Sequence, residues 1–377
     1  MAEITPVPLA RLTTLRSGAA PARMFEAHTR DELVATLRAV WAEGEEWFVL
    51  GGGSNLFVGD ESFDGTVVCV RTSGVTLLPS PHPGRMRVRA EAGHRWDDLV
   101  AYTVERGLAG IEAMSGIPGT VGAAPIQNIG AYGQEIAETL VEVELLDEDA
   151  DEITVVAASE LGLGFRTSAL KHHYGEEPER RAVIVSVTLD LAETTGEREV
   201  RGEQLRGALG LAEGQPMALA TVREQILAIR ARKGMVLDDA DVDTHSAGSF
   251  FQNPIISAQA ARGLPDDCPR WPVTPDRDEA TVIPLGEYDG AVPALRAPNP
   301  DVKISAAWLI EHAGIRRGFA LPRSRAALST KHALALSNRG GATGEELAEL
   351  ARFVRARVHA EFGLMLQPEP VLVGVEL

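Results

Sequence analysis

Cysteine and long hydrophobic runs are what this sequence lacks most clearly. Its 377 residues include two cysteines, Cys69 and Cys268, too few for a disulfide framework and unlike a metal-ligand set. Cys69, inside the apolar stretch VVCVR, is expected to point into a core as a small hydrophobic residue. No apolar run approaches the ~18 residues needed to span a membrane, and the first residues lack the hydrophobic region of a secretory signal. The sequence therefore predicts a cytoplasmic protein.

Positive charge is also scarce. The chain has 36 lysines and arginines against 54 acidic residues, a formal net charge of −18. Nucleic acids and anionic membrane surfaces would be repelled by this field, so neither is expected as a partner. An anionic ligand would need a local basic cluster, which makes the basic residues inside motifs informative. The length allows two or three domains, each with its own core.

Glycine, by contrast, is concentrated in one stretch, Ser115 to Glu135, which reads SGIPGTVGAAPIQNIGAYGQE. Its five glycines permit positive φ and close main-chain approach, while Pro118 and Pro125 prevent a helix. Amides left unpaired in such a run can point at an anion. A plain connecting loop is the alternative, but loops of this length in compact domains are uncommon and usually functional. We interpret residues 115–135 as a ligand cradle, and call them the cradle below.

A second glycine cluster, Gly51 to Asn55, follows a short apolar strand expected over 47–50. A strand that runs into a glycine turn suggests dinucleotide binding, but the Rossmann fingerprint needs glycine at the sixth position, which here is Leu56. No amphipathic helix follows, and the next expected element is a strand over 65–71. The turn therefore fits a β-rich flavin fold, with a plain hairpin turn as the alternative.

Hydrophobic periodicity and capping signals predict the remaining elements. Thr29 and Thr343 each begin a capping box before an amphipathic stretch, and Thr221 has the same spacing to Glu224. Residues 262–302, rich in Pro, Asp and Gly, are expected to form a surface insertion with a little β structure. The expected helices are 30–43, 97–106, one from Thr221 ending before Gly234, 306–312 and one from Thr343 to Phe362; the expected strands are 85–90, 140–146, 153–156, 183–191 and 370–375.

Five separated motifs resemble, in order, those of the UDP-N-acetylenolpyruvoylglucosamine reductase family: LGGGSNL, GIPGTVGAAPIQNIGAYGQEI, GFRTS, AGSFFQNP and QPEP. The match covers nearly the whole chain. It implies an α+β fold with a two-part FAD-binding region of the vanillyl-alcohol-oxidase type and a C-terminal α+β substrate domain. The implied divisions are 1–72 joined by the last strand 370–377, then 73–233, then 234–369.

The resemblance also implies a reaction. NADPH would give a hydride to non-covalently bound FAD, and the reduced flavin would pass it to C3 of UDP-N-acetylglucosamine enolpyruvate, forming UDP-N-acetylmuramate for peptidoglycan. A proton must reach C2. The residues implied to bind FAD are Gly51, Gly52, Gly53, Ser54, Asn55, Gly116, Ile117, Pro118, Gly119, Gly122, Asn128, Gly130, Tyr132 and Gly133.

Three residues match the family's catalytic set. Arg166 would hold the substrate carboxylate, Ser249 would donate the proton to C2, and Glu369 would act with Arg166 on the enolate. Outside this context each has a plainer interpretation, as a surface ion-pair arginine, a turn serine and a solvated carboxylate. A carboxylate beside an enolate would be repulsive, so we expect Glu369 to have a raised pKa or an arginine partner.

Lys233, Asn253 and Arg201 are the residues implied to bind substrate. Lys233 could instead complement a helix C-terminus, and Arg201 falls where related chains carry a tyrosine lid. Phe165 and Gln252 depart from the family, which usually has tyrosine and often lysine there.

Two other functions remain open at this point. An alcohol or sugar oxidase of the same flavin fold would share the glycine motifs, although neither motif contains the His or Cys that often tethers flavin in such enzymes. A non-catalytic nucleotide-binding module would keep the glycines without needing Arg166, Ser249 and Glu369.

Overall fold

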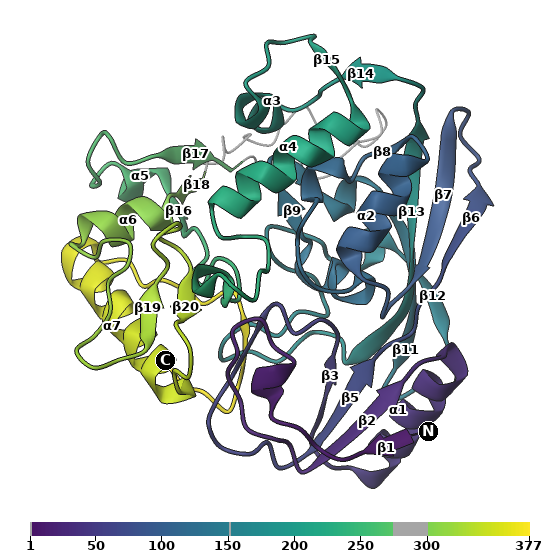
Figure 1. Ribbon diagram of the computed structural model, residues 1–377, viewed down its shortest axis with the longest axis horizontal. Coiled ribbons are helices and arrows are strands. Elements are labelled where there is room, and N and C mark those ends of the chain that lie inside the picture. The colour runs from purple at the N-terminus through teal and green to yellow at the C-terminus, as the bar shows by residue number, and fades with distance from the viewer. Residues whose placement is uncertain (1, 151, 274–300) are drawn as a thin grey trace, which may run out of the picture.

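Three parts of the chain, each built on its own sheet, make up the computed structural model, which describes residues 2–150, 152–273 and 301–377 (Figure 1). The first part is a four-stranded sheet in which the second to fourth strands run parallel. Its order is β1 (Ala2–Ile4), β2 (Arg23–Ala27), β5 (Thr66–Val70), β3 (Trp47–Leu50). Cys69 on β5 is fully buried, as predicted.

Helix α1 (Arg30–Glu43) connects β2 to β3, and its capping box confirms the sequence prediction. The Thr29 hydroxyl accepts from the Glu32 amide at 3.2 Å, and the Glu32 carboxylate accepts from the Thr29 amide. The helix ends at Gly44, whose φ of 69° lies in the left-handed region that glycine adopts without a steric cost.

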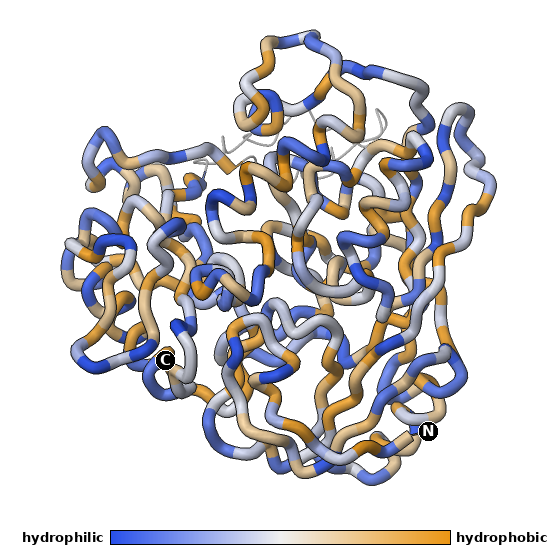
Figure 2. The backbone as a smooth tube through the Cα atoms, in the orientation of Figure 1, coloured by the Kyte–Doolittle hydropathy of each residue, from blue (hydrophilic) through white to orange (hydrophobic). Residues whose placement is uncertain are grey.

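The second part is a larger antiparallel sheet. Its strands follow the order β12 (Thr154–Ala157), β11 (Leu140–Asp147), β13 (Ala182–Glu193), β7 (Arg85–Glu91), β6 (Val75–Pro79), with β8 (Leu108–Ala109) beside β13. The hairpin of β11 and β12 confirms the pair of strands predicted around the DEDAD turn. One buried cluster runs from Leu33 and Leu37 on α1 to Val185 and Val187 on β13, so the two parts share a core. Figure 2 shows hydrophobic segments along these strands and hydrophilic segments mainly in the peripheral turns.

Three helices and a small hairpin close the second part. They are α2 (Trp96–Glu105), α3 (Glu203–Leu209), the hairpin β14 (Glu197–Glu199) with β15 (Pro216–Ala218), and α4 (Leu219–Arg232). The predicted start of α4 at Thr221 is wrong. The helix begins directly after β15 with Leu219, whose burial with Val222 favours an earlier first turn even though Ala218 offers no side-chain cap. Its end before Gly234 is as predicted.

The third part packs around another hydrophobic core, which also includes Leu15 and Phe57 of the first part. It contains the sheet β16 (Ile255–Ser257), β18 (Asp301–Ile304), β17 (Arg270–Pro272), the hairpin β19 (Ala326–Leu328) with β20 (Leu336–Asn338), and the helices α5 (Ala258–Ala261), α6 (Ala306–His312) and α7 (Gly344–Phe362). Strands β17 and β18 supply β structure predicted for 262–302, of which residues 274–300 lie outside the described residues. Thr343 caps α7 with a capping box, as predicted.

The chain finally returns to the first part. Strand β21 (Val371–Val373) pairs in parallel with β4 (Leu56–Val58), the strand that follows the GGGSN turn. The Val371 amide also donates to the Asn55 carbonyl at 2.9 Å. This pairing places the QPEP motif beside the GGGSN turn, although the two are more than 300 residues apart in sequence.

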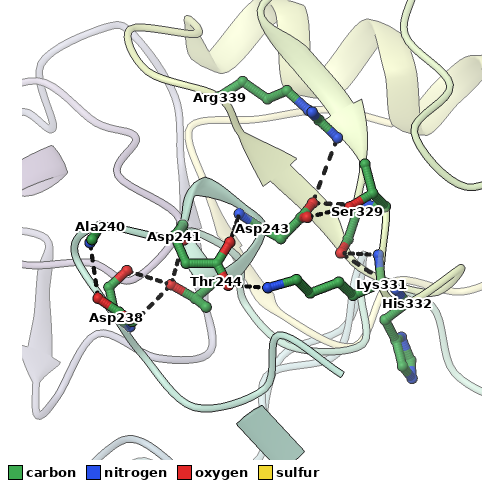
Figure 3. A network of polar contacts seen from close by, with 10 residues as sticks. Asp238, Ala240, Asp241, Asp243, Thr244, Ser329, Lys331, His332 and Arg339 are labelled. Carbon is green, nitrogen blue, oxygen red and sulfur yellow. Dashed lines mark hydrogen bonds and ion pairs between the residues drawn. The ribbon is translucent and has the colours of Figure 1, made fainter. Parts of the chain in front are cut away.

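A polar network holds the acidic segment after α4 against the hairpin of β19 and β20 (Figure 3). Asp243 accepts from the Thr330 amide at 2.8 Å and lies 3.5 Å from the Arg339 guanidinium. Asp241 pairs with Lys331. The acidic segment that leads into AGSFFQNP is thereby held against the hairpin of β19 and β20.

Among the described residues, no helix combines the length and the apolar character that crossing a lipid bilayer requires.

Candidate active site

The GGGSN turn and the cradle pack main chain against main chain. A Cβ atom added to Gly52 would lie 2.6 Å from the Cα of Gly119, and one added to Gly119 would lie 2.7 Å from the Ser54 hydroxyl. Gly119 also has a φ of 123°, a conformation that other residues rarely adopt. Both glycines are therefore required for the two loops to meet.

This junction fits a cofactor that carries phosphate. The amides of Gly52, Gly53 and Ser54 donate to no acceptor among the described residues, and Gly52 is exposed. Successive main-chain amides without partners form a concavity that binds anions without a basic side chain. The residues at the junction thus suit the diphosphate of a dinucleotide such as FAD.

Helix α2 anchors the first half of the cradle. The Asp97 carboxylate accepts from the Gly116 amide at 2.6 Å and binds both Nη atoms of Arg223, on α4, at 2.6 and 2.8 Å. Burial acts to raise the pKa of Asp97, but these hydrogen bonds prevail and hold that pKa below its ordinary value. The cradle is thus tied to two helices through one ionised carboxylate.

The second half of the cradle holds Arg166. Its Nη1 donates to the Asn128 carbonyl at 3.1 Å and its Nη2 to the Gly130 carbonyl at 2.9 Å. Arg166 has a φ of 57°, which costs a non-glycine residue roughly 1–2 kcal/mol. Asn128 itself is buried, and its side chain bonds to Glu135, Gly164 and Ala137 within the protein.

Glu369 lies against the same guanidinium. The Nε of Arg166 is 3.3 Å from Oε1 of Glu369, and the two side chains are only 21% and 15% exposed. Burial raises the pKa of the Glu369 carboxyl, while Arg166 and Lys171 oppose the rise. Both features that the sequence led us to expect, a raised pKa and an arginine partner, are present together.

Ser249 belongs to the strand-like segment that pairs with QPEP. The Glu369 amide donates to the carbonyl of Phe250 at 2.8 Å, and Phe251 forms a bridge with Pro368. Ser249 directly precedes Phe250 and is half-buried. The structure thus pairs Arg166 with Glu369 and joins the main chain of Glu369 to Phe250, the residue that follows Ser249.

Lys233 and Tyr132 form a second cluster. Lys233 is exposed at the end of α4, and its ammonium lies 5.7 Å from the centre of the Tyr132 ring. Arg201 is exposed between β14 and α3, and Gln204, three residues on, packs where a Cβ on Gly133 would contact it. Within the described part of the chain, Arg201 forms no hydrogen bond or ion pair with Arg166, Ser249 or Glu369.

Asn253 lines a cavity of about 360 Å³ together with Phe165 and Gln252. Its side-chain carbonyl accepts from the Ala306 amide at 2.9 Å, which fixes the start of α6. The cavity is open to solvent and is lined by Phe165, the neighbour of Arg166 in sequence, so it is a candidate for part of the substrate site.

Two lysines, one buried and one half-buried, were missed by the sequence interpretation. Lys303 on β18 places its ammonium 4.6 Å from the centre of the Phe165 ring, and burial lowers its pKa. Lys171 lies five residues after Arg166 and contacts Glu369. Neither belongs to the quoted motifs, and an available signal was overlooked: only four of the 36 basic residues are lysines, namely Lys171, Lys233, Lys303 and Lys331.

Comparison with known protein families gives two matches. Residues 21–156 match a family described as an FAD binding domain, and residues 240–373 match the C-terminal domain of UDP-N-acetylenolpyruvoylglucosamine reductase.

Whole-chain relatives carry the same name. The chain is 50% identical to the UDP-N-acetylenolpyruvoylglucosamine reductase of Leifsonia xyli over 99% of each chain. It is 43% identical to that of Mycobacterium tuberculosis H37Rv, over 98% of this chain and 95% of the other. The solved structure of the corresponding reductase from Thermus caldophilus, 24% identical, aligns over 98% of each chain with a TM-score of 0.60, which shows a common fold.

Proposed function

The chain belongs to the UDP-N-acetylenolpyruvoylglucosamine reductase family, and we propose that Arg166, Ser249 and Glu369 act on its substrate. The protein is an FAD-dependent oxidoreductase that uses NADPH to reduce UDP-N-acetylglucosamine enolpyruvate to UDP-N-acetylmuramate in peptidoglycan synthesis. Bound FAD supplies the hydride carrier between NADPH and the substrate. The residue roles below are the proposal.

The hydrogen bonds of Arg166 support its role. A guanidinium has five N–H donors; Nη1 and Nη2 of Arg166 each use one for the Asn128 and Gly130 carbonyls, while Nε lies 3.3 Å from a Glu369 carboxylate oxygen. The second N–H of each Nη therefore remains for the substrate carboxylate. When hydride arrives at C3, negative charge spreads over C2 and this carboxylate, and a fixed guanidinium stabilises that charge more than it stabilises the ground state.

Ser249 and Glu369 would complete the protonation of C2. Serine is a weak acid, so it can donate only to a strongly basic carbon that is held beside it. Ser249 is held by its neighbour Phe250, whose carbonyl binds the Glu369 amide. A Glu369 carboxyl with a raised pKa can share a proton with this site, and its pairing with Arg166 limits its repulsion of the enolate.

We also propose how the parts divide the ligands. Residues 1–72 with 370–377, and 73–233, would hold FAD between the GGGSN turn and the cradle. Residues 234–369 would close on the UDP-sugar, with Asn253 in the cavity beside Phe165, and with Lys233 and Arg201 near the diphosphate. The enzyme would work in the cytoplasm, where NADPH is regenerated.

The test separates the two half-reactions by anaerobic stopped-flow absorbance of the flavin band. In E369Q, reduction of bound FAD by NADPH should keep its wild-type rate, whereas reoxidation by the enolpyruvyl substrate should slow by ~10²-fold or more. S249A should show the same selectivity. The control E311Q removes a carboxylate that pairs with Arg317 on the surface, and it should change neither rate.

Full-rate reoxidation in E369Q would remove Glu369 from the proposed set. If wild-type flavin stayed reduced with the substrate and reoxidised only after oxygen was admitted, the oxidase alternative would replace the reductase mechanism.

A further inference from the structure

Lys171 is a buried cation with an unusual set of partners. Its side chain comes from the loop that follows Arg166, and the residue is only 3% exposed. The ammonium donates to the main-chain carbonyl of Glu369 at 2.9 Å and to the Gln127 side-chain oxygen at 3.3 Å. Both of these acceptors are neutral. The Lys171 ammonium therefore does not form a simple ion pair with a carboxylate.

These partners belong to a junction of four chain segments. The Asn55 side-chain amide of the GGGSN turn donates to the Gln127 oxygen at 2.6 Å, and it lies 3.4 Å from the same Glu369 carbonyl. Gln127 belongs to the cradle. Lys171 thus joins the turn, the cradle, its own loop and the returning segment at one point. On the other side, the Glu369 amide donates to Phe250. The main chain of Glu369 is consequently held from both directions.

The charge of Lys171 is costly for a group that only links segments. Burial lowers the pKa of its ammonium to about 8, with the nearby Arg166 guanidinium acting in the same direction and the Glu369 carboxylate opposing them. Burial lowers the pKa values of the adjacent His172 and His173, and the charge of Lys171 acts in the same direction. A neutral amide could make the same hydrogen bonds without desolvating a charge. The ammonium contacts the main chain of Glu369, the residue whose carboxyl pKa its charge acts to lower.

The amino-acid composition also indicates that a lysine at this position has a specific role. Lysine is rare in this chain, at four of 36 basic positions, so arginine is used almost wherever a cation is needed. An arginine side chain is longer and planar, and it cannot lose its proton, whereas lysine presents a compact charge. The small site between the Glu369 carbonyl and Gln127 suits the smaller group.

We propose that Lys171 is a positioning residue for Glu369: its ammonium fixes the Glu369 main chain against the GGGSN turn and the cradle, and its field acts on the Glu369 carboxylate during substrate reduction. The inference rests on the proposed role of Glu369. It assigns Lys171 no contact with substrate or FAD.

The experiment is a double-mutant cycle of K171M and E369Q, followed by anaerobic stopped flow. K171M alone should slow flavin reoxidation by the enolpyruvyl substrate by ~30-fold, in the range of one lost charged hydrogen bond at an active site. Reduction by NADPH and FAD affinity, measured by fluorescence titration of the apoprotein, should change less than about threefold. In the E369Q background, K171M should slow reoxidation by less than about threefold, because Lys171 acts through the Glu369 carboxyl, which is already absent.

The matched control is R180M, which removes a cation paired with Asp147 outside this junction. It should leave both half-reactions within about twofold of wild type. Equal slowing by K171M with and without E369Q would overturn the inference while leaving Glu369's own role intact. Slowing of both half-reactions together with FAD loss would also overturn it, because Lys171 would then be a general structural residue. A full-rate E369Q would instead reject the proposed function of Glu369.

A second measurement follows the pH dependence of flavin reoxidation. In the wild-type protein the reoxidation rate should fall as pH rises through about 8, where Lys171 loses its charge. In K171R, which stays protonated, this decline should be absent even if the rate is lower at every pH. A wild-type rate that stays level to pH 9.5 would reject the proposal.

Discussion

The loop that connects β12 to β13 carries two arginines, Arg166 near its start and Arg180 near its end. Each forms an ion pair, and the two pairs lie in different surroundings. Arg166 lies beside Glu369 with one contact of 3.3 Å. Arg180 binds Asp147 through both Nε and Nη2, the latter at 2.7 Å. The Arg180 pair is the more exposed, with 31% and 21% of the two side chains reachable by solvent.

The two carboxyl groups respond in opposite ways. Hydrogen bonding by Arg180 lowers the pKa of Asp147, whereas burial raises the pKa of Glu369 despite its arginine. An arginine partner therefore does not by itself fix a carboxylate's charge; the balance between desolvation and hydrogen bonding does. The Arg166–Glu369 pair, which has the longer contact, also includes a residue with a positive φ, Arg166. Such a costly arrangement is typical of a site kept for chemistry rather than stability.

The largest expected difference between the pairs is in catalysis. R166M should slow flavin reoxidation by the enolpyruvyl substrate by ~10²–10³-fold, because it removes the two N–H donors left for the substrate carboxylate and leaves Glu369 without its partner. R180M should change the same rate less than about twofold. Anaerobic stopped-flow absorbance at several substrate concentrations measures both.

Thermal unfolding distinguishes a catalytic effect from a folding defect. R180M should lower the free energy of unfolding by less than about 1 kcal/mol, as for other partly exposed pairs. If R180M slowed reoxidation as much as R166M, the loop would act as one structural unit and the contrast between its ends would disappear.

The sequence could identify Arg166 and Glu369 but not the residues that surround them in the fold. Arg166 and Glu369 each lie in a short motif with its own signature, and α1 and α7 begin at capping boxes, which are local features. Lys171 and Glu369 are 198 residues apart, and their contact depends on β21 returning to β4. No local pattern encodes such a meeting. The same reason explains the error at α4, where the burial of Leu219 overrode the capping signal at Thr221.

Stability should respond in opposite directions to removal of the two carboxylates. At pH 7 with saturating FAD, E369Q should raise the melting temperature, because the folded protein disfavours ionised Glu369. D147N should lower it, because the folded protein favours ionised Asp147. Differential scanning calorimetry of both variants and wild type measures the two shifts.

The pH dependence of stability provides a control for the directions of these two melting-temperature shifts. A carboxyl with a raised pKa contributes stability below its unfolded value, near 4.5, and loses it as pH rises through the folded value. The advantage of E369Q should therefore grow from pH 4.5 toward neutrality. A carboxyl with a lowered pKa contributes above its unfolded value, near 3.8, so the deficit of D147N should shrink on acidification below that pH. Shifts of the same sign at pH 7 would contradict this account.

The smallest expected effect on the reoxidation rate comes from substitution of Phe165, the apolar residue next to Arg166. Phe165 lies between two cations, with Lys303 at 4.6 Å and the Arg166 guanidinium at 5.6 Å from its ring centre, and it lines the cavity shared with Asn253. F165Y adds a hydroxyl but keeps the ring face, so both cation–π contacts persist. We expect reoxidation by the enolpyruvyl substrate to change less than about threefold, with any change in apparent substrate affinity rather than in the limiting rate. F165L, which removes the ring, should have the larger effect of the two. A tenfold rise in the limiting rate of F165Y would instead mean that a hydroxyl beside Arg166 contributes to the chemistry, and that this chain works without it.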